Sequence, residues 1–171
     1  MTKLTRDFFL QPTLEVAQNL LGKEMVFGGK RGVIYETEAY IGQEDPACHA
    51  AKGLTPRTKV MFGLGGHSYV YLIYGMYHCL NFVTEVEGFP AAVLIRGVWL
   101  PEKDIRLNGP GKVCQYFGIS RMHNAVDLVN HSHFYVTSGI TIPFFTQTPR
   151  IGIRQGLDKL WRFVGDITST R

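Results

Sequence analysis

The chain has 171 residues, a length at which a single domain can bury roughly 70% of its unfolded surface. Hydrophobic residues make up 45% of it without any run long enough to span a bilayer, so we expect neither a disordered nor a membrane protein. The net charge of +4 fits a polyanionic partner such as nucleic acid, although the basic residues are dispersed. The three cysteines are widely spaced, so we expect them to be reduced thiols. No apolar leader follows Met1, and we expect a single cytoplasmic domain, residues 1–171.

The first predicted elements are a helix over residues 12–21, with Pro12 in its first turn, and a β-hairpin of strands 23–27 and 32–40. Further along, the sequence predicts an irregular segment at 46–57, a hairpin of strands 68–73 and 77–84, and a strand at 90–98. It then predicts a short helix from Gly109 to Phe117. Residues 123–171 are predicted to form short strands, with one helical turn at 157–161. Hairpins connect most strands, so we expect an α+β domain with a largely antiparallel sheet.

The strand at 32–40 carries two acids. If its side chains alternate strictly, Ile34, Glu36, Glu38 and Tyr40 share one face, and Val33, Tyr35, Thr37 and Ala39 share the other. Two carboxylates beside an aromatic ring in an apolar strand indicate a general-base site, because a low dielectric raises the pKa of a carboxyl group. The same alternation is also that of two solvated carboxylates on an exposed face, and it does not say which acid acts.

The second hairpin is rich in aromatic residues. Tyrosines stand at positions 69, 71, 74 and 77, and the bend falls near Tyr74-Gly75-Met76, where only the glycine is a preferred turn residue. Large apolar side chains at a turn indicate a wedge for a partner, and duplex DNA is a suitable one, because apolar wedges unstack base steps from the minor groove. A core hairpin whose tyrosines form hydrogen bonds at its rim is the alternative.

Two loop segments are candidates for phosphate contacts. Thr55-Pro56-Arg57 and Gly109-Pro110-Gly111-Lys112 combine exposed amides with a cation, although ordinary turns have the same composition. The histidines lack metal-ligand spacing, and His131 and His133 near Asp127 come closest to it. We therefore expect no metal and no cofactor.

Several motifs, taken in chain order, resemble one family. These are Glu36-Thr37-Glu38-Ala39-Tyr40, His49, Thr55-Pro56-Arg57, Met61-Phe62, the tyrosine-rich segment 69–81, Val93-Leu94-Ile95-Arg96 and the segment 109–115. Over residues 8–164 the chain resembles the alkyladenine (3-methyladenine) DNA glycosylases of the mammalian type. The resemblance implies a single compact domain with a curved, open-barrel-like antiparallel sheet, short flanking helices and a protruding hairpin that enters the DNA minor groove. It also implies a monofunctional, cofactor-free monomer that hydrolyses the N-glycosidic bond of damaged purines in double-stranded DNA.

The resemblance assigns roles to individual residues. Glu38 matches the acid that activates water, which decides between the two acids, and Arg96 matches the arginine that supports it. Tyr40, His49 and Tyr71 match the pocket for the flipped base, and Asn81 matches the residue at its floor. The DNA-contacting positions are Tyr74, which replaces the flipped base in the duplex, Met76 and Tyr77 beside it, and Tyr69, Thr55, Arg57 and Lys112.

The chain departs from the family at residues 102–108, where longer members carry a basic insertion, and it has no extended N-terminal arm. We therefore expect non-specific DNA binding that is weaker and more sensitive to salt than in the longer members. A protein that acts on DNA would lie in the nucleoid of a bacterium or in the nucleus of a eukaryote. The sequence does not rank 3-methyladenine, 7-methylguanine, hypoxanthine and ethenoadenine as substrates. Two alternatives remain: a non-catalytic binder of damaged or distorted nucleic acid, and a glycosidase of free nucleosides or RNA.

Overall fold

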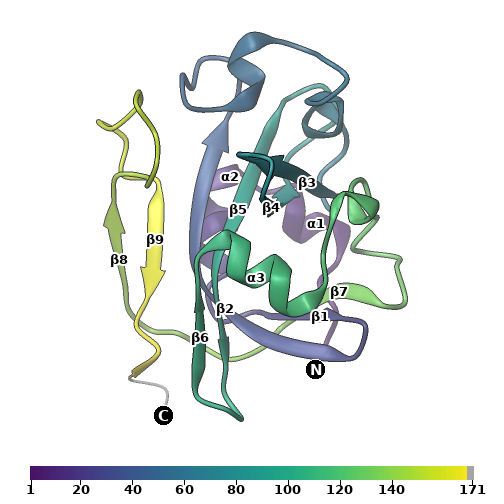
Figure 1. Cartoon of the computed structure of the whole chain (residues 1–171), viewed down its shortest axis with the longest axis vertical. Helices are drawn as coiled ribbons and strands as arrows, with labels where there is room; N and C mark the ends of the chain where they lie inside the picture. The colour runs from purple at the N-terminus through teal and green to yellow at the C-terminus, as the bar shows by residue number, and fades with distance from the viewer. Residues whose placement is uncertain (169–171) are drawn as a thin grey trace.

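Two long neighbouring strands form the middle of a nine-stranded sheet in the computed structural model, which describes residues 1–168 (Figure 1). Strand β2 (Lys30–Ile41) pairs antiparallel with β5 (Ala91–Leu100) along most of its length. The sheet order is β3-β4-β5-β2-β1-β7, with β6 attached to β5 and the β8–β9 pair attached to β2. Every strand pair in residues 1–168 is antiparallel, which confirms the expected α+β domain with a curved antiparallel sheet.

The helices are few and short. They are α1 (Arg6–Phe9), α2 (Thr13–Asn19), α3 (Pro110–Phe117) and the 3-10 segments η1 (His49–Lys52), η2 (Lys59–Phe62) and η3 (Arg121–His123). The remaining strands are β1 (Glu24–Phe27), β3 (Ser68–Ile73), β4 (Tyr77–Val83), β6 (Ile105–Asn108), β7 (Phe134–Thr137), β8 (Phe145–Thr148) and β9 (Arg162–Gly165). No helix among residues 1–168 is long and apolar enough to cross a membrane.

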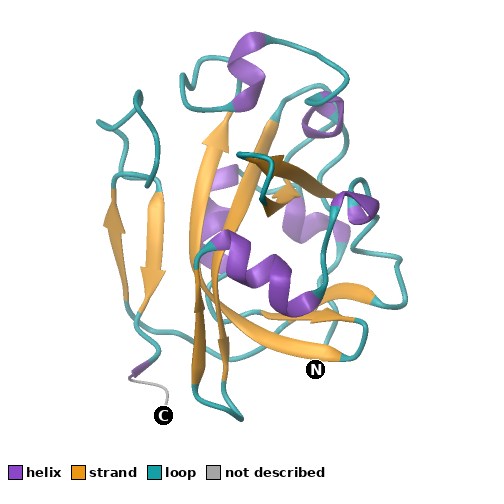
Figure 2. Ribbon diagram, in the orientation of Figure 1, coloured by secondary structure: helices purple, strands orange, loops and turns teal. Residues whose placement is uncertain are grey.

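Local sequence accounts for the first half of the fold. Gly28 and Gly29 have φ values of 55° and 85°, and positive φ at both central residues is what a two-residue hairpin turn of type I′ requires. The helix predicted at 12–21 forms as α2, which packs Val16 and Ala17 into the core and whose Ala17 carbonyl accepts a hydrogen bond from the Thr37 hydroxyl. In Figure 2, α2 lies behind the long strands and α3 lies in front of them.

The register between β2 and β5 is irregular around Glu36. Ile34 pairs with Val98 and Thr37 pairs with Ile95, while the register shifts on either side of Glu36. The two shifts cancel, because three residues separate these two pairs on both strands, so the alternation of side chains is kept on either side of Glu36. Ile34 and Ala39 both belong to the main core cluster, which includes residues of α2 and of α3. The register is therefore that of the predicted alternation: the Thr37 hydroxyl donates to Ala17 of α2, and Glu38 accepts from the Tyr40 hydroxyl on the other face.

The other differences from prediction lie in the second half of the chain. Residues 105–108, within the short segment after Pro101, form strand β6 and pair with the second half of β5. The predicted helical turn at 157–161 is wrong: the Lys159 amide donates to the Gly156 carbonyl in a single turn that does not continue as a helix. The short strands β7, β8 and β9 do lie within residues 123–168 as predicted, and residues 169–171 lie outside the described part of the chain.

The irregular register leads to a prediction about stability. Gly97 lies opposite Glu36, and a Cβ added there would come 2.8 Å from the Tyr35 ring and 3.0 Å from the Glu36 Cβ. We expect Gly97→Ala to lower the free energy of unfolding by roughly 1–3 kcal/mol, the usual range for overpacking. Gly165→Ala in β9 is the control, because its Cβ would come no closer than 3.1 Å to the Ile142 side chain and 3.4 Å to the Tyr35 carbonyl oxygen. Urea titrations that show equal losses for both variants would contradict the prediction.

Candidate active site

A cavity of about 260 Å³ opens on the face of the sheet formed by β3, β4, β5 and the end of β2. Its lining is mostly aromatic and apolar, with a few polar groups: Tyr40, Ala47, His49, Met61, Tyr69, Tyr71, Ile73, Tyr74, Cys79, Asn81, Leu94, Arg96, Pro110, Ile151, Gly152 and Ile153. Concave, largely apolar sites with few polar groups are typical of small-ligand binding.

Strand register explains why residues far apart in the sequence meet here. Tyr69 pairs with Asn81, Asn81 with Leu94, and Leu94 with Glu38. Directly paired residues on adjacent strands share a face, so these four side chains form one row across the sheet. Three of the four line the cavity, and Glu38 lies at the end of the row, behind the cavity wall.

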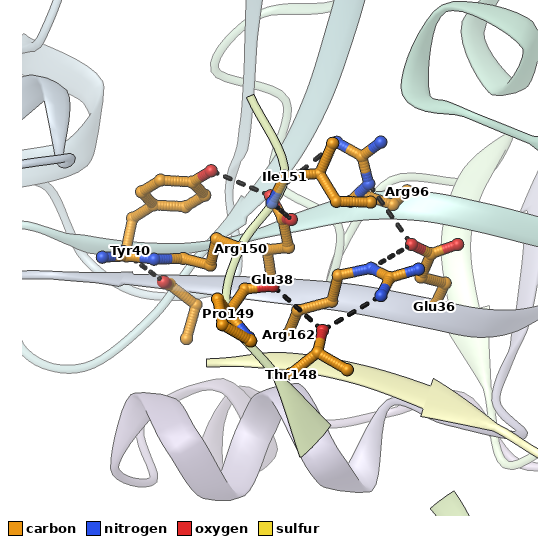
Figure 3. A network of polar contacts seen from close by, with 10 residues as sticks. Glu36, Glu38, Tyr40, Arg96, Thr148, Pro149, Arg150, Ile151 and Arg162 are labelled. Carbon is orange, nitrogen blue, oxygen red and sulfur yellow. Dashed lines mark hydrogen bonds and ion pairs between the residues drawn. The ribbon is translucent and has the colours of Figure 1, made fainter. Parts of the chain in front are cut away.

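The Glu38 side chain is fully buried and both of its oxygens have donors (Figure 3). The Tyr40 hydroxyl donates to Oε1 at 2.8 Å, and the Ile151 amide donates to Oε2 at 2.7 Å. Arg96 Nη1 lies 3.8 Å from Oε1. Burial raises the pKa of Glu38 above its ordinary value, while Arg96, the Ile151 amide and the Tyr40 hydroxyl act in the opposite direction.

Glu36 is buried too, but its surroundings are different. Its Oε2 accepts from Arg162 Nε at 2.7 Å and from Arg96 Nε at 3.3 Å. The alternative of two solvated carboxylates is therefore wrong, since Glu36 is 3% exposed and Glu38 is 0% exposed. Arg96 contacts both acids, but it lies closer to Glu36 than to Glu38.

Protonated tyrosines and a neutral histidine form the aromatic wall. Burial, with the Glu38 charge next in size, raises the pKa of Tyr40 far above its ordinary value, so its hydroxyl remains a donor. Burial lowers the pKa of His49 to about 4, and the nearby Arg57 and Lys52 act in the same direction. The His49 ring stands edge-on to Tyr71, with 4.5 Å between centroids, and its Nδ1 lies 2.9 Å from the Tyr69 hydroxyl.

The turn between β3 and β4 projects aromatic side chains at the edge of the cavity. Tyr74 lines the cavity and is nonetheless 84% exposed, and Met76 is 70% exposed. Tyr74 and Gly75 have φ values of 53° and 65°, and the Met76 amide donates to the Ile73 carbonyl. A bulky residue at positive φ is strained, at a cost of about 1–3 kcal/mol, so this turn holds an exposed ring at the expense of stability.

The predicted site residues separate into two groups. Tyr40, His49, Tyr69, Tyr71, Tyr74, Asn81 and Arg96 line the cavity, with Glu38 hydrogen-bonded to its wall. Met76, Tyr77, Thr55, Arg57 and Lys112 lie outside the lining. Tyr69, predicted to contact DNA, is only 2% exposed and so belongs to the interior of the pocket.

Sequence reasoning missed the segment that closes the cavity from the C-terminal side. Ile151, Gly152 and Ile153 line it, and they follow Arg150, which forms a buried ion pair with Asp45. The available signal was an arginine next to apolar residues at 150–153, but nothing local links it to an acid 105 positions earlier. Among residues 1–168, no group of three histidine, cysteine, aspartate or glutamate side chains is placed to hold a metal.

A buried carboxylate beside an aromatic cavity, next to an exposed aromatic turn, is the arrangement of a nucleic-acid N-glycosylase. A sequence model of the methylpurine-DNA glycosylase (MPG) family matches residues 7–168. The chain belongs to this family.

Bacterial relatives cover nearly the whole chain. A Rickettsia felis protein is 58% identical over 163 residues, covering 94% of this chain and 92% of the relative. A Rickettsia conorii protein is 59% identical over 168 residues, with coverages of 96% and 91%. A Sodalis glossinidius protein is 58% identical over 163 residues, with coverages of 95% and 96%. Each of the three carries the name "Putative 3-methyladenine DNA glycosylase".

Because Glu38 is buried, we expect its ionised carboxylate to lower the free energy of unfolding at neutral pH. Because the pKa of Glu38 is raised in the folded state, ionisation opposes folding above that pKa. The cost vanishes below the pKa of the unfolded chain, where the group is protonated in both states. We therefore expect Glu38→Gln to raise Tm at pH 7–8, by about 2–4 °C for each kcal/mol gained.

The gain from Glu38→Gln should shrink as the pH falls toward 4. Glu36→Gln is the matched control and should lower Tm, because it weakens the pairing of Arg96 and Arg162. Thermal unfolding of both variants across pH tests the prediction, and a Glu38→Gln variant less stable than the native chain at pH 8 would contradict it.

Proposed function

We propose that this protein removes alkylated or deaminated purines from double-stranded DNA by hydrolysing the N-glycosidic bond, leaving an abasic site. The observation that carries the proposal is the Glu38 carboxylate, buried against the wall of a cavity of about 260 Å³ lined by aromatic rings. Membership of the methylpurine-DNA glycosylase family and the names of the bacterial relatives support it. The bacterial relatives also fit the expected cytoplasmic location.

In this proposal Glu38 takes a proton from water while the water oxygen bonds to C1′ of the extruded nucleotide. The base leaves with the electron pair of the broken bond, and a purine alkylated at N3 or N7 leaves as a neutral molecule. Positive charge develops on the sugar, and the carboxylate stabilises it electrostatically. Burial makes Glu38 a stronger base than a solvated carboxylate, while Arg96 and the two hydrogen-bond donors favour its ionised form.

The aromatic wall would hold the extruded base. Tyr40, Tyr71 and His49 offer stacking surfaces, and stacking is worth roughly 1–3 kcal/mol per base. A cationic base over these rings gains roughly 0.5–2 kcal/mol more. His49 contributes as a neutral ring, because burial lowers its pKa to about 4. Asn81, paired with Tyr69 and buried, lies where its amide can contact the base edge.

The exposed turn would enter the duplex from the minor-groove side. Tyr74 would fill the space of the extruded base, with Met76 and Tyr77, which are 70% and 51% exposed, beside it. Gly111 at the start of α3 packs against the Tyr77 ring, which places exposed Lys112 near the turn. Lys112, Arg57 and Thr55 would contact phosphates, and one monomer would suffice.

Replacing the acid tests the proposed chemistry. We expect Glu38→Gln to reduce single-turnover release of 3-methyladenine or hypoxanthine from duplex oligonucleotides by at least about 100-fold, since it removes the general base. Binding to an abasic duplex should persist, because the cavity and the turn are unchanged. Normal release by this variant would remove Glu38 from the mechanism. Tight binding without release by the native protein would favour the non-catalytic alternative.

The strained turn gives a second test. Tyr74→Gly removes the ring but tolerates positive φ, whereas Tyr74→Ala removes the ring and keeps the strain. We expect both to lower base release from duplex DNA more than about tenfold, since unstacking costs about a few kcal/mol. Release from single-stranded DNA should change little, and Tyr74→Gly should unfold at the same or a higher temperature than the native protein. Unchanged release from duplex DNA would favour a glycosidase of free nucleosides or RNA.

A further inference from the structure

Asp45 and Arg150 form a completely buried ion pair beside the cavity. Arg150 Nη1 lies 2.6 Å from Asp45 Oδ2, and Nη2 lies 2.9 Å from Oδ1, so the guanidinium and the carboxylate face each other with two parallel hydrogen bonds. Both side chains are 0% exposed. Buried ion pairs are often no more stabilising than apolar residues of the same volume, so stability alone is a weak reason for one here.

The pair continues the hydrogen bonding of β2 where its neighbouring strand stops. Strand β9 pairs with β2 as far as Glu38, and the Trp161 carbonyl then accepts from the Ala39 amide. Beyond that point side chains replace the strand: Arg150 Nη1 donates to the Ala39 carbonyl at 2.9 Å, and Asp45 Oδ2 accepts from the Ile41 amide at 3.1 Å. The pair therefore fixes the stretch of β2 that carries Glu38 and Tyr40.

The same arginine fixes two groups of the site. Its chain neighbour Ile151 donates its amide to Glu38 Oε2, and the Arg150 guanidinium lies 4.8 Å from the Tyr40 ring centroid (Figure 3). The guanidinium also lies 5.0 Å from the centroid of the Trp161 ring. Apolar packing holds this segment weakly, because Ile151, Leu157 and Leu160 are 46–51% exposed.

We infer that the Asp45–Arg150 pair is a positioning element of the site, which holds the Ile151 amide on Glu38 and the Tyr40 ring against the cavity. Neither residue lines the cavity, so the pair acts through its neighbours. The inference deepens the proposed function, and it adds a specific consequence for the acid. The groups that face Glu38 are Arg96, Glu36, the Tyr40 hydroxyl and the Ile151 amide. The hydrogen bond from the Ile151 amide lowers the pKa of Glu38, so displacing this amide should raise that pKa.

Arg150→Lys and Asp45→Asn test the inference. Lysine keeps the charge but cannot reach both Asp45 oxygens and the Ala39 carbonyl with one planar group. We expect the acid limb of the pH profile of single-turnover base release to move to higher pH. On that limb the rate of base release should fall about tenfold, because one hydrogen bond to an ionised group is lost. The rate on the plateau of the profile should change less. The pKa of Glu38, followed by carbon-13 NMR of its carboxyl group, should rise in parallel.

The Arg6–Asp127 ion pair supplies a matched control. Arg6 Nη2 donates to both carboxylate oxygens of Asp127, at 2.8 and 2.7 Å, and neither residue lines the cavity. Asp127→Asn should lower Tm while leaving the acid limb and the pKa of Glu38 as in the native protein. The double variant Asp45→Leu/Arg150→Met removes both charges while keeping buried volume, and should fold yet show the same shift of the acid limb.

The outcomes separate the two proposals. If the Asp45 and Arg150 variants lower Tm but leave the acid limb and the Glu38 titration unchanged, the pair is structural only and the inference is overturned. If the native protein releases no base, the proposed function fails, while the NMR titration of Glu38 still tests the positioning by Asp45 and Arg150.

Discussion

An acid kept in a dry environment is the constraint on which the rest of the structure depends. Burial disfavours the ionised form of Glu38, and three donors oppose that effect: the Tyr40 hydroxyl, the Ile151 amide and Arg96. They come from β2, from the segment between β8 and β9, and from β5. Glu38 and Ile151 are more than 100 positions apart in the sequence, yet the Ile151 amide lies 2.7 Å from the Glu38 carboxylate. A single carboxylate therefore brings together distant parts of the chain.

The two long strands make that meeting compatible with a stable core. Alternate residues of β2 after Glu36 face opposite ways, so Ala39 packs in the main core while Glu38 and Tyr40 face the site. The two register shifts around Glu36 cancel, so this alternation continues toward Ile34, which pairs with Val98. The core and the site thus share the same strands, and hydrophobic packing on one side holds the register of the polar row on the other.

Sequence reasoning succeeded where the determinants are local. The glycine turn, helix α2, both hairpins and the shared face of Glu38 and Tyr40 follow from period and turn chemistry. It missed strand β6, because residues 105–108 become a strand through pairing with β5 and carry no strong strand pattern of their own. It also missed the Asp45–Arg150 pair, because two charged residues 105 positions apart carry no local sign that they are buried together. The assignment of individual roles came from the family resemblance rather than from periodicity.

The two acids of β2 differ in a way that no strand pattern reveals. One oxygen of Glu36 accepts from two arginines, at 2.7 and 3.3 Å, so its charge is largely committed to holding β5 and β9 onto β2. Glu38 has one arginine nitrogen at 3.8 Å and otherwise only neutral donors. Burial raises the pKa of Glu38, and a carboxylate with a raised pKa is the stronger base. In the proposed mechanism Glu38 is the acid that accepts a proton, while Glu36 pairs with Arg96 and Arg162.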